Sequence, residues 1–83
     1  MIVIAGRFNY SKEVRFWEVG NKITGWSNAN TGDYALVHNN GGFDLVEIAG
    51  IMVTDEKYLK SLGVPYGHVT QKVIMFIPKK YLE

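Results

Sequence analysis

His38 and His68 are the two side chains best suited to acid–base chemistry near neutral pH. Two histidines and a lysine are sufficient for metal-independent RNA cleavage, in which one imidazole acts as base, the other as acid, and the lysine stabilises the phosphate charge. Two water-facing histidines at strand ends explain the same residues without any chemistry. A ribonuclease that uses His38 and His68 therefore ranks third, after the two binding hypotheses given below. We expect a protein that is not an enzyme.

Other catalytic and metal-binding patterns are absent from the sequence. The chain has no cysteine, no H-x-x-H or H-E-x-x-H motif, and no carboxylates at calcium-loop spacing. Gly41-Gly42 precedes an expected strand, so no helix N-terminus follows it to hold a phosphate. We expect no catalytic residues, no metal and no cofactor.

Aromatic residues are interleaved with basic ones in the first third of the chain. Such a set can stack nucleic-acid bases and neutralise phosphates, or it can anchor a protein partner. The nucleic-acid alternative would use the basic and aromatic residues near both ends of the chain, which are Arg7, Tyr10, Lys12, Arg15, Trp17, Lys22, Lys72, Lys79 and Lys80.

Trp17 is the best single candidate for a protein interface. It follows Phe16 in an expected strand, and adjacent strand residues point to opposite faces. If Phe16 is in the core with Trp26, Trp17 is exposed or covered by a partner. Arg15 and Val19 would share its face, so these three residues form the predicted protein interface.

The charges are segregated along the sequence although the net charge is only +1. No Lys or Arg occurs from Ile23 to Glu56, whereas all the basic residues lie in the flanks. An acidic face could therefore meet a basic partner, although a solvated surface would show the same pattern. The acidic residues of the middle segment are Asp33, Asp44, Glu47, Asp55 and Glu56.

Dense turn signals predict a chain of short antiparallel strands. The strands expected from the apolar runs cover residues 1–8, 13–19, 22–27, 33–38, 43–53 and 68–77. Gly20-Asn21 and Asn40-Gly41 suit tight hairpin turns, because both residue types tolerate positive φ. Gly50 favours a bulge or bend inside its long strand.

One short amphipathic helix is expected near residues 55–62, before the last strand. Thr54 would cap it, Tyr58, Leu59 and Leu62 would share its apolar face, and Gly63 would end it. The tail after Pro78 is expected to fray. The fold class is therefore mainly β with one short helix, in a small barrel or strongly curved sheet of about five to six strands.

The segment GDYALVHNNGGFDLVEIAGI resembles the Gly-Asp-strand-turn-strand element of SH3-like small barrels, including KOW-type domains. This resemblance covers about a quarter of the chain. It implies a binding module, because SH3-like barrels mostly bind proteins or nucleic acids. The compact chain also looks like small accessory proteins of phages and mobile elements.

The length of 83 residues predicts a single domain over residues 1–83. Lack of cysteine and of an apolar run of roughly 18–20 residues predicts a cytoplasmic protein without a membrane contact. Our leading hypothesis is an adaptor or inhibitor that binds another protein, and the alternative is nucleic-acid binding. Self-association is also expected if the apolar last strand, centred on 73–77, lies at a sheet edge.

Overall fold

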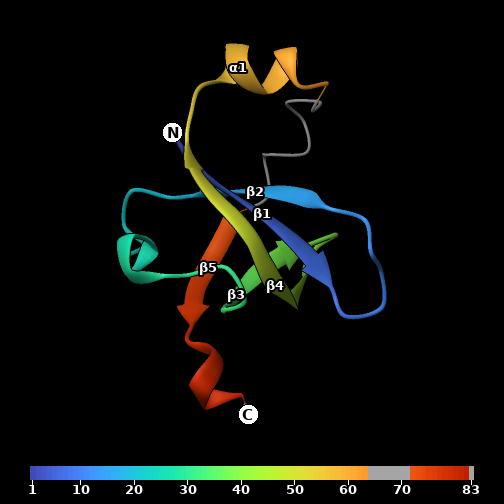
Figure 1. Ribbon diagram of the computed structural model, residues 1–83, viewed down its shortest axis with the longest axis vertical. Coiled ribbons are helices and arrows are strands. Elements are labelled where there is room, and N and C mark those ends of the chain that lie inside the picture. The colour runs from blue at the N-terminus through green and yellow to red at the C-terminus, as the bar shows by residue number, and fades with distance from the viewer. Residues whose placement is uncertain (64–71, 83) are drawn as a thin grey trace.

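The chain folds into a closed five-stranded barrel, seen in a computed structural model that describes residues 1–63 and 72–82 (Figure 1). The strands are β1 (Ile2–Phe8), β2 (Arg15–Val19), β3 (Tyr34–Asn39), β4 (Gly42–Val53) and β5 (Lys72–Ile77). Their order around the barrel is β1-β2-β5-β3-β4, and β4 pairs again with β1. The short helices are α1 (Glu56–Ser61) and the 3-10 turns η1 (Trp26–Asn28) and η3 (Lys79–Tyr81). The predicted mainly β fold with one short α-helix is confirmed.

The hairpin of β3 and β4 forms as its sequence predicts. The two strands pair antiparallel from Tyr34 opposite Glu47 to Asn39 opposite Gly42. Asn40 and Gly41 have φ values of 51° and 82°, and a type I′ turn requires positive φ at both central positions. The turn residues therefore fix the register of the hairpin.

The long strand β4 serves two neighbours in succession. Its first half pairs with β3 and its second half with β1. Ala5 lies opposite Gly50 and Gly6 opposite Ile48, so Ala49 is an extra residue in β4. This bulge confirms the irregularity expected at Gly50, and such bulges let a strand curve around a barrel.

The expected strand over residues 22–27 is wrong. The chain turns after β2, where Ile23 N donates to Gly20 O at 3.0 Å, and then enters η1 through Gly25 at φ 93°. A residue with that φ cannot continue an extended strand. The free side of β2 is taken instead by β5, which pairs with it in parallel at Glu18–Lys72 and Val19–Val73.

The last strand and the tail also differ from their expected placement. β5 lies between β2 and β3, so it is not the open sheet edge that the self-association hypothesis assumed. The tail is held as well, because Lys79 N donates to the carboxylate of Asp33 at 3.0 Å. Residues 68–71 of the expected strand lie outside the described residues.

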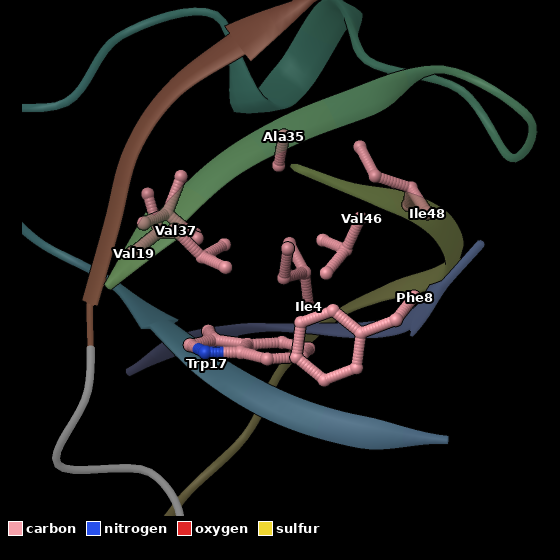
Figure 2. Packing of buried hydrophobic residues seen from close by; sticks show 9 residues of the cluster. Ile4, Phe8, Trp17, Val19, Ala35, Val37, Val46 and Ile48 are labelled. Atoms are coloured by element: carbon pink, nitrogen blue, oxygen red, sulfur yellow. The ribbon is translucent and has the colours of Figure 1, made fainter. Parts of the chain in front are cut away.

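Two apolar clusters stabilise the barrel. The larger one fills the interior, with side chains from all five strands converging (Figure 2). The smaller one lies outside the barrel, where Leu59 of α1 covers Val3 with Phe16 and Met52 at the margin.

The helix α1 differs from its prediction in two details. Its cap is Asp55 rather than Thr54, because Asp55 Oδ1 accepts from Tyr58 N at 2.8 Å. Only Leu59 is buried, while Tyr58 and Leu62 are exposed. Within the part of the chain that the structure describes, no helix has the length and apolar character to cross a membrane.

Candidate functional site

Trp17 is a core residue, so its predicted role as an exposed interface anchor is wrong. Its side chain is only 2% exposed, and its indole Nε1 donates to the carbonyl of His38 at 3.0 Å. The ring is nearly perpendicular to that of Phe8 inside the barrel, with 5.6 Å between the two ring centres (Figure 2). Strand β2 is covered on both faces, with Trp17 inside and Phe16 near α1, so two adjacent aromatic residues are both accommodated.

The rest of the predicted protein interface is also divided. Val19 is buried in the same interior cluster as Trp17. Arg15 is exposed, with its guanidinium carbon 5.6 Å from the centre of the Phe8 ring. Arg15, Trp17 and Val19 therefore do not share an accessible surface.

Of the two histidines, only His38 can be placed. It is exposed near the end of β3, and its ring lies 5.2 Å from that of Phe43. His68 lies outside the described residues, so the pair that a ribonuclease would need stays a prediction. Among residues 1–63 and 72–82, no group of three or more His, Asp or Glu side chains is arranged to hold a metal.

The residues of the nucleic-acid alternative are dispersed over the barrel. Arg7 lies near one end of β1, whereas Lys72 adjoins Ile2 at the other end and contacts Glu18. Among pairs within residues 1–63 and 72–82, Arg7, Arg15 and Lys72 of that set each have a carboxylate within 4 Å. Tyr10 remains 69% exposed, but Trp17 is unavailable for stacking.

An apolar surface lies on the outside of β3, β4 and β5, and we call it the hairpin face. Ala35, Val37 and Val46 point into the barrel, so the residues between them point outward. The hairpin face consists of the outward side chains Tyr34, Leu36, Phe43, Leu45, Met75 and Ile77.

The register of the three strands aligns these side chains in rows. Leu36 lies opposite Leu45 on one side and opposite Met75 on the other, which makes one apolar row across three strands. Tyr34 lies opposite Ile77 in the next row. Phe43 is 69% exposed and Met75 is 48% exposed, so this part of the surface is open to solvent.

The described part of α1 does not cover the hairpin face. Its buried Leu59 packs on Val3, and Phe16 and Met52 adjoin this contact, so α1 lies over β1, β2 and the far end of β4. In Figure 1 the helix stands at one end of the barrel, and the tail that follows β5 leaves at the other end. Phe43 and Met75 of the hairpin face are accordingly exposed.

A groove of about 730 Å³ adjoins the hairpin face and shares Tyr34 and Leu45 with it. Its apolar lining residues are Phe8, Tyr34, Leu45 and Leu82. Its charged lining residues are Arg7, Lys12, Asp44 and Glu47. Asn9 and Ser11 complete the lining, so the groove is mixed in polarity and balanced in formal charge.

Asp33 fixes the tail that carries Leu82 into the groove lining. Its Oδ1 accepts from Lys79 N at 3.0 Å, and its Oδ2 accepts from Asn30 N at 2.9 Å. The hydrogen bond from the Lys79 amide, followed by that from Asn30, lowers the pKa of the Asp33 carboxyl. The carboxylate thus joins the tail to the loop before β3.

Sequence reasoning missed the hairpin face, although a signal was present. In residues 34–37 and 73–77, apolar side chains occupy odd and even positions alike. A strand with one solvated face would instead alternate apolar and polar residues. In β3 the second apolar side, Tyr34 and Leu36, is the outward one.

The chain matched no protein-family model, no curated protein and no solved structure.

Proposed function

We propose that this protein is a non-enzymatic binding module that recognises another protein through the hairpin face. The observation that carries the proposal is the outward apolar row of Leu45, Leu36 and Met75. Contiguous exposed apolar surface, rimmed by polar residues, is typical of protein interaction sites. The role is the one expected from the sequence, but the surface differs from the predicted one around Trp17.

The composition of the hairpin face favours a protein partner over a nucleic acid. None of its six residues is Lys or Arg, and the charged residues next to it on β4 are Asp44 and Glu47. Phosphate binding depends on cations, so this surface is unsuited to it. Aromatic residues and methionine are enriched at protein interfaces, and this surface has both in Tyr34, Phe43 and Met75.

Two parts of the sequence reasoning agree with this proposal. A binding module is the role that the resemblance to SH3-like barrels implies. A chain without cysteine also suits the reducing cytoplasm, where we propose that the protein acts.

The test compares the wild type with Phe43→Asp/Met75→Asp as bait in a lysate treated with nuclease. Both changed side chains are exposed, so the barrel should remain folded, which urea denaturation checks. We expect to recover a protein partner that binds the double variant at least about tenfold more weakly than the wild type. A loss of this size is typical when hot-spot residues are removed. Tyr58→Asp is the control, because the Tyr58 side chain lies on α1 and its exposed fraction is between those of Phe43 and Met75.

Two outcomes would contradict the proposal. One is a partner that binds the double variant as tightly as the wild type. The other is recovery of nucleic acid alone, with an affinity that falls steeply as salt rises. Sedimentation of the purified protein distinguishes a second copy from a foreign partner, since Met75 and Ile77 of β5 belong to the same surface.

A further inference from the structure

The groove beside the hairpin face contains one charged side chain that the barrel does not use. Arg7 lies 3.9 Å from Glu47, so these two opposite charges face each other. Asp44 accepts from Leu45 N at 2.9 Å and from the Tyr10 hydroxyl at 3.4 Å. Among the described residues, Lys12 is the remaining charged lining residue, and no carboxylate there lies within ion-pair distance of its ammonium group.

The surroundings of Lys12 suit a ligand that is both apolar and anionic. Tyr34 and Leu45 supply the accessible aromatic and aliphatic walls, Phe8 lies almost completely buried behind them, and the volume of about 730 Å³ falls in the range of ligand pockets. Tyr10, in the same loop as Lys12, stacks on Phe8 with 5.0 Å between the ring centres and is itself 69% exposed.

We infer that the groove receives an apolar side chain of the partner protein together with an adjacent carboxylate, and that Lys12 selects the carboxylate. This inference rests on the proposed function, because the groove continues the hairpin face through Tyr34 and Leu45. An acidic residue next to an aromatic or aliphatic one is thus the feature that the partner presents. Lys12 is a specificity residue, and the apolar walls supply most of the contact.

The inference can be tested with small probes, without knowledge of the partner. Phenylpropionate, phenylpropionamide and phenylpropylamine share one apolar group and differ in charge. Each is titrated into the labelled protein and followed by amide chemical shifts. We expect phenylpropionate to change the amide chemical shifts of Phe8, Lys12 and Leu45. We also expect it to bind about threefold to fivefold tighter than the amide, which is the gain from one exposed ion pair.

Two variants test the role of Lys12. Lys12→Glu should reverse the order, so that phenylpropylamine binds tighter than phenylpropionate. Lys57→Glu makes the same change on α1, away from the groove, and should leave the wild-type order unchanged.

The outcomes also separate this inference from the proposed function. Met75→Asp should not weaken probe binding, because Met75 belongs to the hairpin face but does not line the groove. Equal affinity for acid and amide, or an unchanged order in Lys12→Glu, would overturn the role of Lys12. Loss of the partner in Phe43→Asp/Met75→Asp would still support the hairpin face in that case.

Discussion

Gly6 occupies a position where the barrel interior has no space for a side chain. A Cβ added there would lie 3.0 Å from Val46 Cγ2 and 3.2 Å from Trp17 Cζ3. We expect Gly6→Ala to lower the free energy of unfolding by about 1–3 kcal/mol, because an overpacked core must displace its neighbours. Urea denaturation measures the loss.

Gly50→Ala is the matched control for this prediction. A Cβ on Gly50 meets no atom within 4 Å, and its φ is not in the left-handed region, so we expect little change. Equal effects of the two substitutions would show that the close contacts of Gly6 do not determine the change in stability, because the entropic effect of Gly→Ala acts at both positions.

Trp17 shows why residue placement was harder to predict than residue type. Alternation correctly assigned Phe16 and Trp17 to opposite faces of a strand, but it does not say which face is interior or that both are covered. That information comes from α1, whose Leu59 lies more than forty residues away in the sequence. Trp17→Ala would therefore report on folding, since truncation of a buried tryptophan costs about 3–5 kcal/mol.

The elements with local signals were the ones that the sequence predicted well. The turn at Asn40-Gly41 and the irregularity at Gly50 each depend on a few adjacent residues. The strand predicted at 22–27 is absent for a long-range reason. The side of β2 that a hairpin partner would have used is paired with β5 instead. The hairpin face as a whole could not be predicted from local sequence, because it depends on the pairing of β5 with β3 that puts Met75 opposite Leu36.

The tail and the loop before β3 form a unit that depends on ionised Asp33. The pKa of Asp33 is lower in the folded chain than in the unfolded one, so its contribution to stability is present above its unfolded value. That contribution is lost as the pH falls through the folded value. We expect Asp33→Asn to destabilise the protein at neutral pH and to expose the Lys79 amide to hydrogen exchange.

The difference between wild type and Asp33→Asn should narrow as the pH falls through the lowered pKa of Asp33, because the wild-type carboxyl then takes up a proton. Urea denaturation across this range measures it, and Glu13→Gln serves as a control at an exposed carboxylate. A difference that is constant with pH would mean that the charge of Asp33 does not hold the tail.

At the scale of the whole molecule, the barrel is paired unevenly. β1 and β4 pair over most of their lengths, whereas β2 and β5 share only Glu18–Lys72 and Val19–Val73 among the described residues. The hairpin face lies on the extensively paired side, over β3, β4 and β5. A rigid arrangement of Leu36 and Leu45 lowers the entropy that is lost when a partner binds.

The short parallel pairing of β2 with β5 also has a consequence for the order of folding. It joins residues more than fifty positions apart, so forming it costs loop-closure entropy. Few contacts between the two strands offset that cost. The β3–β4 hairpin, whose ends are close in sequence, forms its contacts earlier. In stopped-flow experiments, Val73→Ala should mainly accelerate unfolding, whereas Val46→Ala should also slow refolding. The barrel would then close last, at the junction of β2 and β5, after the β3 and β4 part of the hairpin face has already formed.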